Sequence, residues 1–260
     1  MRSSPSYFLC CSGLLALGAL MLAPACTQPP AESRAAAAAA HAFVPDSTGY
    51  EHRPPQDPNG ISKYYHGRQI AHVMGHEGAD WLERPNRAEE ERTDLLLQAL
   101  QLKPTDVVAD LGAGTGFFTF RLSPLVPQGR VLAVDIQPEM LRAIESTKAR
   151  THLTNVEPIL GTTKSPNLPP ASVDLVLLVD AYHEFDHPRE MMQAVRRALK
   201  PGGRVALVEY RAEDPQVPIK RIHKMSMDQA RRELEDVGLE FVENIDRLPQ
   251  QHLLIFRRPR

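Results

Sequence analysis

The sequence predicts an α/β fold, in which a mainly parallel sheet is flanked by helices. Short apolar runs that end in an acid, at residues 107–110 and 130–135, alternate with stretches of helical pattern. This alternation is typical of parallel sheets. A glycine-rich turn over residues 112–116 directly follows the first run. Such a turn before a helix lets backbone N–H groups approach a ligand closely, so we expect a binding site there.

Length and composition narrow the choice of protein class. The chain has 260 residues, enough for one such domain with additional N-terminal sequence. Its formal net charge is -2, so no overall basic charge indicates a nucleic acid as partner. The cysteines, Cys10, Cys11 and Cys26, all lie in the leader. We therefore expect no disulfide, cysteine-based zinc site or cysteine nucleophile in the folded part.

Residues 1–26 are predicted to be a signal peptide or lipoprotein leader. Arg2 precedes an apolar run over residues 9–23, which is short for a membrane span of about 20 residues. Cleavage after the small residues 23–25 would release the protein. A lipobox-like sequence at 22–26 would instead place a lipid on Cys26 and attach the chain to a membrane.

We accordingly expect an exported or membrane-anchored protein on the periplasmic side. The alternatives are an uncleaved anchor and a start codon assigned too early, which would leave the chain in the cytoplasm. Cell fractionation with an antibody tests this expectation.

Three further segments follow the leader. Residues 27–60 are rich in Pro and Ala and are predicted to be a disordered linker. Residues 61–94 are predicted to be a helical segment, and residues 95–260 the main domain. His72 and His76 would share one helix face, but no third ligand accompanies them, and we predict no metal site.

The glycine turn differs from a dinucleotide fingerprint. Its pattern is G-x-G-x-G, and Phe117 stands where the third glycine of G-x-G-x-x-G would be. Asp110, two residues before Gly112, would repel a pyrophosphate and favours a cationic or amino-bearing ligand. A second acid, Asp135, ends the next strand. A carboxylate at this position can accept hydrogen bonds from both ribose hydroxyls of a nucleoside.

These residues resemble a known family. Residues 108–116 closely resemble motif I of the class I S-adenosylmethionine (SAM) dependent methyltransferases, and residues 181–185 and 199–210 resemble later parts of that family in the same order. The likeness extends over residues 95–256 and is greatest to the small-molecule group that includes ubiquinone and menaquinone biosynthesis enzymes. It implies a Rossmann-like seven-stranded sheet of order 3-2-1-4-5-7-6, whose last strand is antiparallel.

The resemblance also implies SAM as cofactor. In that family the acid at Asp110 lies close to the amino group, the acid at Asp135 holds the ribose, and Ile136 would pack on the adenine. Thr162 stands where the family often has an acid for the adenine amino group. The complete set of predicted cofactor-binding residues is Asp110, Gly112, Ala113, Gly114, Thr115, Gly116, Asp135, Ile136, Gly161, Thr162 and Asp180.

We expect the catalytic residues directly after the apolar strand at residues 174–180. His183 and Glu184 follow that strand, and ligands of open α/β sheets bind beyond the carboxyl ends of the strands. His183 would act as a general base or hold the acceptor, and Glu184 would orient it. The alternative is that His183 only packs beside the cofactor. Residues 209–225 would line the acceptor site or, alternatively, form a solvated loop.

The sequence thus predicts a methyltransferase for a small-molecule acceptor whose identity, like the oligomeric state, the sequence does not reveal. A dinucleotide-dependent oxidoreductase is disfavoured by the glycine spacing and by Asp110. A third interpretation is an exported SAM-binding or catalytically inactive protein on a methyltransferase fold, because SAM is made in the cytosol and fold does not fix function.

Overall fold

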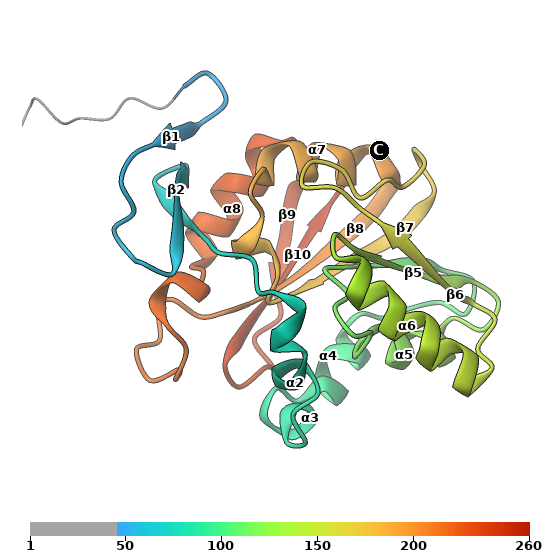
Figure 1. Ribbon diagram of the computed structural model, residues 1–260. Helices are drawn as coiled ribbons and strands as arrows, with labels where there is room; N and C mark the ends of the chain where they lie inside the picture. Colours follow the sequence, from blue (N-terminus) through green and yellow to red (C-terminus); the bar gives the residue numbers. More distant parts are fainter. Residues whose placement is uncertain (1–45) are drawn as a thin grey trace, which may run out of the picture. The chain divides into compact units, whose positions relative to one another are not determined.

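The computed structural model describes residues 46–260, which all belong to one unit (Figure 1). The predicted leader, Cys26 and residues 27–45 of the predicted linker lie outside the described residues. Within residues 46–260, no helix is both long enough and apolar enough to cross a membrane.

A seven-stranded sheet forms the centre of the described residues. Its order is β6-β5-β4-β7-β8-β10-β9, and β10 pairs antiparallel with both neighbours while the other pairs are parallel. The predicted order 3-2-1-4-5-7-6, with its last strand antiparallel, is confirmed. The strands are β4 (Val107–Leu111), β5 (Arg130–Asp135), β6 (Val156–Leu160), β7 (Val173–Val179), β8 (Leu199–Tyr210), β9 (Glu240–Asn244) and β10 (Gln251–Arg257).

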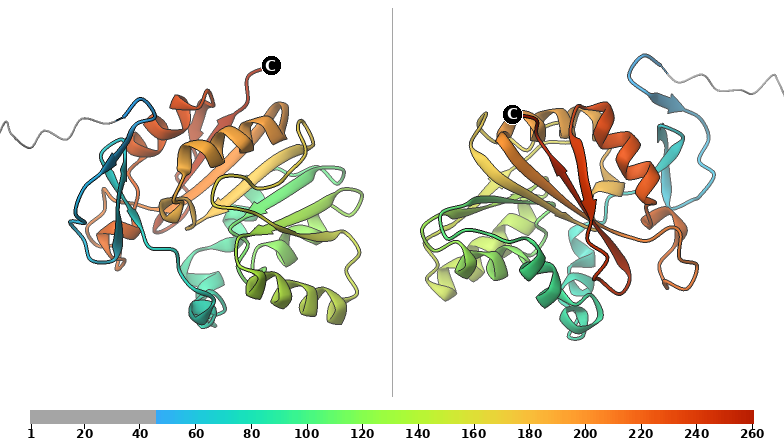
Figure 2. Two further views of the ribbon diagram at one scale, coloured as in Figure 1. Left: turned by 45° about the horizontal axis from the view of Figure 1, so that its top comes forward. Right: turned by 180° about the vertical axis from the view of Figure 1, so that it is seen from behind.

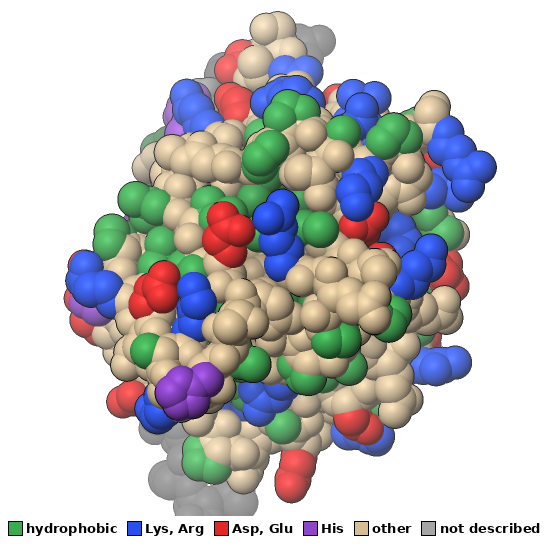
Figure 3. Space-filling model, turned by 90° about the vertical axis from the view of Figure 1, so that its right-hand side faces the viewer, with side chains coloured by type: hydrophobic (Ala, Val, Ile, Leu, Met, Phe, Trp, Pro, Cys, Tyr) green, Lys and Arg blue, Asp and Glu red, His purple; other side chains and the backbone are tan. Residues whose placement is uncertain are grey.

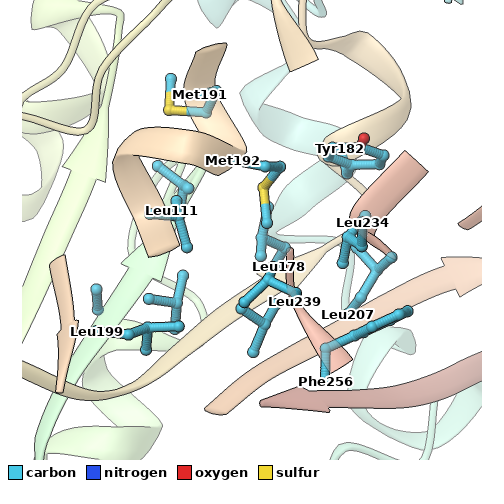
Figure 4. Packing of buried hydrophobic residues seen from close by; sticks show 14 of the residues in the cluster. Leu111, Leu178, Tyr182, Met191, Met192, Leu199, Leu207, Leu234, Leu239 and Phe256 are labelled. Carbon is cyan, nitrogen blue, oxygen red and sulfur yellow. The ribbon is translucent and has the colours of Figure 1, made fainter. Parts of the chain in front are cut away.

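Helices cover both faces of this sheet, because the central strands are apolar on both faces. Val108 of β4 packs in the core that includes α4 and the residues around α5. The next residue, Ala109, packs in the core that includes α7 and α8. Figures 1 and 2 show these two pairs of helices on opposite sides of the sheet. Figure 4 shows Met192 of α7 next to Leu178 of β7 in this second core.

The helix boundaries follow local signals in the sequence. Pro138 opens α6 and Pro188 opens α7, where the missing proline N–H is not needed. Ser226 caps α8, since its hydroxyl accepts a hydrogen bond from the Gln229 N–H at 3.2 Å. The helices are α2 (Ala79–Leu82), α3 (Arg87–Glu90), α4 (Thr93–Ala99), α5 (Thr119–Leu122), α6 (Pro138–Thr151), α7 (Pro188–Ala198) and α8 (Met227–Asp236), and the 3-10 turns are η1 (His76–Gly78), η2 (Ser123–Leu125), η3 (Tyr182–Glu184) and η4 (Arg221–His223).

The helical segment predicted for residues 61–94 is wrong over its first part. A small antiparallel sheet of β1 (Tyr50–His52), β2 (Gly60–Tyr65) and β3 (Arg68–Ala71) occupies this region, and β1 also shortens the predicted linker. Buried aromatic side chains favour strands here. His66 and Gly67, both with positive φ, form the two-residue hairpin turn between β2 and β3.

A buried ion pair joins this small sheet to the main domain. The guanidinium of Arg68 on β3 donates two hydrogen bonds to Glu233 on α8, at 2.7 and 2.8 Å. Glu233 is fully buried and also accepts from the Tyr182 hydroxyl at 2.8 Å and the Gln229 amide at 2.7 Å. A third nitrogen of Arg68 donates to the backbone oxygen of His183 at 3.1 Å. The small sheet, α8 and η3 are therefore held together by one network.

The surface carries charges of both signs. On the face drawn in Figure 3, Lys and Arg side chains are interspersed with Asp and Glu side chains. This mixture agrees with the small net charge of -2.

We predict that Arg68→Ala lowers the free energy of unfolding by about 3–5 kcal/mol, because it leaves the Glu233 carboxylate buried without its counter-ion. Urea unfolding measures this loss. The matched control is Glu235→Ala on the same helix, which removes the exposed pair with Arg231 and should cost less than about 1 kcal/mol. Equal losses in the two variants would contradict the importance of the buried pair.

Candidate active site

A pocket opens at the carboxyl ends of β4, β5 and β7, and encloses about 890 Å³ when its open mouth is included. This is the edge of the sheet at which the sequence predicted a ligand. Its wall includes eight of the predicted site residues, namely Gly112, Gly114, Asp135, Ile136, Gly161, Thr162, Asp180 and Glu184. Met74 and Leu82 of the N-terminal segment also line it.

The glycine turn after β4 has a backbone that other residues would strain. Gly112 has a φ of +80°, and a Cβ atom there would lie 2.7 Å from the Cβ of Ala181. Gly114 has a φ of +55°, and a Cβ atom there would lie 2.6 Å from the side chain of Leu82. The turn therefore needs glycine both for its conformation and for the close approach of neighbouring chain.

Asp135 connects this turn to the end of β5. One carboxylate oxygen accepts the Gly114 N–H and the other accepts the Gln137 N–H, each at 2.9 Å. Burial raises the pKa of Asp135, although these backbone hydrogen bonds oppose the shift. Each carboxylate oxygen can accept a second hydrogen bond, so Asp135 can bind ligand hydroxyls while it holds the turn.

Five predicted site residues lie outside this pocket wall. Ala113 is buried in a small apolar cluster, whereas Thr115 and Gly116 line a separate groove in which the Thr115 hydroxyl donates to Glu83. His183 lies in a second pocket. Asp110, the fifth, is buried behind the turn.

The carboxylate of Asp110 accepts a hydrogen bond from the Thr119 hydroxyl at 2.6 Å. Burial raises the pKa of Asp110 to about 6, even though this bond lowers it. Asp110 thus ties the end of β4 to the start of α5. Its expected contact with a ligand amino group stays a prediction.

The second pocket adjoins the first. The two share Met74, Leu82, Val179, Asp180 and Glu184 in their walls. The second pocket encloses about 1370 Å³ with its open mouth. Its further lining includes Arg87, Glu91, His183, Tyr210 and His223, together with the apolar side chains of Trp81, Pro218 and Ile219.

Asp180 stands at the junction of the two pockets with a strained backbone, at a φ of +49°. One of its oxygens accepts the Gln251 amide at 2.8 Å. The other is buried and finds no hydrogen-bond partner within residues 46–260. Burial and then the charge of Glu91 raise the pKa of Asp180. An unpaired carboxylate oxygen at this place fits a ligand that carries a positive charge.

His183 is oriented by Glu209 from the end of β8. Its Nδ1 lies 2.6 Å from a Glu209 oxygen, and its Nε2 lies 3.1 Å from the Nδ1 of His223 on η4. Burial by itself would lower the pKa of His183, but the nearby carboxylates, Glu209 first and then Glu184 and Asp180, together raise it above its usual value. Burial and the neighbouring His183 lower the pKa of His223 to about 4. If the Nδ1–H of His183 donates to Glu209, the Nε2 beside His223 is the ring nitrogen that can accept a proton or bind a ligand.

Two features of this site were missing from the sequence-based prediction. Glu209 was included in the segment 209–225 without a role, although an acid at the end of a buried strand is the same signal that singled out Asp110 and Asp135. The approach of His223 to His183 has no local signal, because 40 residues separate them in the chain.

Comparisons with known proteins agree with this geometry. A family model described as "Methyltransferase domain" matches residues 109–205. A methyltransferase-like protein of Schizosaccharomyces pombe is 35% identical over 134 residues, which cover 51% of this chain and 49% of that protein. The malonyl-[acyl-carrier protein] O-methyltransferase of Hahella chejuensis is 36% identical over 104 residues, which cover 39% of this chain and 35% of that enzyme. The chain spans half or less of the length of the curated relatives that it matches first.

A solved structure supports the same assignment of the fold. The crystal structure of a SAM-dependent methyltransferase from Aquifex aeolicus superposes with a TM-score of 0.67 at 24% identity, and the match covers 71% of this chain and 99% of that one. The finer resemblance to quinone biosynthesis enzymes stays a prediction. Residues 109–205 are therefore similar to a methyltransferase domain, and the chain has the fold of the Aquifex SAM-dependent methyltransferase.

Proposed function

We propose that this protein transfers a methyl group from SAM to a small acceptor bound in the second pocket. The observation that carries the proposal is the junction of the two pockets at Asp180 and Glu184. The first pocket has the glycine turn and the ribose-binding acid that SAM requires. The second has polar groups around an apolar wall, which suits a small molecule.

The residues of the first pocket fit the cofactor part by part. Asp135 would accept the ribose hydroxyls, Ile136 would pack on the adenine, and Thr162 would face its edge. The unpaired oxygen of Asp180 suits the part of SAM that carries the positively charged sulfur. When bound, SAM supplies a methyl group on a positively charged sulfur, which is already a good leaving group.

The protein's own contribution would be mainly to align the acceptor with the methyl group of SAM. Positioning two reactants can supply about 7–11 kcal/mol of a reaction barrier. His183, held by Glu209, faces the second pocket and would hold the acceptor or take its proton.

We predict that Asp135→Ala weakens SAM binding by at least about tenfold. The substitution removes a carboxylate whose hydrogen bonds to hydroxyls are worth about 1.5–3 kcal/mol, and it releases the Gly114 N–H. Isothermal titration calorimetry measures the affinity. Glu157→Ala, which removes an exposed acid of the neighbouring strand β6, should bind SAM as the wild type does. Near-wild-type affinity of Asp135→Ala would refute the ribose assignment.

We predict that His183→Ala leaves SAM affinity within about twofold and lowers turnover by roughly 100-fold or more, as expected for a lost proton acceptor. Turnover is measured with methyl-labelled SAM and cell extract as the source of acceptor. His183→Asn should lower turnover in the same way, although its amide can still donate to Glu209. This variant is the control for the effect of leaving the buried Glu209 carboxylate without a donor, as His183→Ala does. Unchanged turnover in both variants would show that His183 is only part of the scaffold.

A further inference from the structure

Three potential metal ligands from two separate turns meet at the wall of the second pocket. They are the Nε2 of His183, the Oε1 of Glu184 on the same turn η3, and the Nδ1 of His223 on η4. These atoms all lie within 4.8 Å of one another. The sequence had offered only the pair His72 and His76, from which we predicted no metal site, and these two residues do not share a helix in the structure.

The distances between these atoms match the spacing of metal ligands. The two histidine nitrogens are 3.1 Å apart, and the glutamate oxygen lies 3.7 Å from one and 3.9 Å from the other. Bonds of about 2.1 Å to a tetrahedral Zn²⁺ place ligand atoms about 3.4 Å apart. The separations from Glu184 are too long for hydrogen bonds, so the carboxylate is oriented towards both rings without bonding to either.

The groups behind the cluster fix its orientation. The Nδ1 of His183 is 2.6 Å from Glu209, which is buried and also accepts the Tyr182 N–H at 2.9 Å. A carboxylate behind a histidine is the usual support of a metal ligand, because it selects the tautomer whose far nitrogen is bare. The other oxygen of Glu184 accepts the Met74 N–H at 3.0 Å, which holds that carboxylate in place.

The cluster has an open side. Three protein ligands leave a coordination position free, as in catalytic rather than structural sites. All three residues line the second pocket, together with the apolar Trp81 and Ile219. Two imidazoles and one carboxylate suit Zn²⁺ and the neighbouring divalent transition metals better than Mg²⁺ or Ca²⁺.

We propose that His183, Glu184 and His223 bind a divalent transition-metal ion whose free position faces the acceptor pocket. The role of that ion rests on the proposed function. With its Nε2 on the ion, His183 would hold the acceptor through the metal and would not itself take the proton. An acceptor hydroxyl or thiol bound to the ion would lose its proton to solvent more readily. The electron pair of the resulting anion would form the new bond to the methyl carbon as the carbon–sulfur bond of SAM breaks, which leaves a neutral thioether. The acceptor class is therefore an alcohol, phenol or thiol.

Titration with Co²⁺ tests the site independently of activity. The full chain is used with Cys10, Cys11 and Cys26 replaced by serine, because thiols also bind these metals. After treatment with a chelator, we expect one Co²⁺ per chain, with visible absorption bands of a four- or five-coordinate ion that Zn²⁺ abolishes. His223→Ala and Glu184→Gln should each weaken Co²⁺ binding by about 100-fold or more, because each removes a ligand of the ion. Loss of a residue that only orients a ligand weakens metal binding by about 10- to 100-fold.

The matched control is His76→Ala, which removes an exposed histidine next to a carboxylate, Glu77, and should leave Co²⁺ affinity unchanged. Absence of saturable Co²⁺ binding, or an equal loss in His76→Ala and His223→Ala, would overturn the metal site. SAM calorimetry on the same proteins separates the two proposals. SAM binding without Co²⁺ binding overturns only the metal site, and Co²⁺ binding without SAM binding overturns only the proposed function.

Discussion

The buried ion pair between Arg68 and Glu233 constrains the geometry of the turn that carries His183. Glu233 is fully buried and the Arg68 side chain is only 10% exposed, so the Glu233 carboxylate is not tolerated without its counter-ion. The pair therefore obliges β3 and α8 to pack together. Because Arg68 also bonds the backbone of His183 and Glu233 also bonds Tyr182, the turn η3 is held from both directions. The position of His183 thus depends on a contact between segments more than 160 residues apart.

Acids at strand ends have different roles in this fold, although burial raises the pKa of each. Asp110 is bonded to Thr119 and serves the packing behind the glycine turn. Asp135 holds that turn and still faces the pocket. Asp180 keeps one oxygen without a partner at the junction of the two pockets. The neighbouring donors, and not the position at the end of a strand, decide which acid is available to a ligand.

The sequence predicted the central sheet well because its signals are local. Apolar strands, the glycine turn and the cap at Ser226 each follow from neighbouring residues, and together they fixed the strand order through the family resemblance. The small N-terminal sheet was missed because its hairpin signal is only His66 and Gly67 between two short strands. The wall around His183 was predicted only in part, since the approach of His223 depends on how two distant turns pack.

Met74 gives the two pockets a common wall. Its N–H is bonded to Glu184 and its backbone oxygen accepts the Gln137 amide at 3.0 Å, so a single peptide segment spans from η3 to the end of β5. It lines both cavities. A ligand that displaced this segment from one cavity would therefore disturb the other, so the proposed function implies that occupancy of the cofactor pocket and occupancy of the acceptor pocket are coupled.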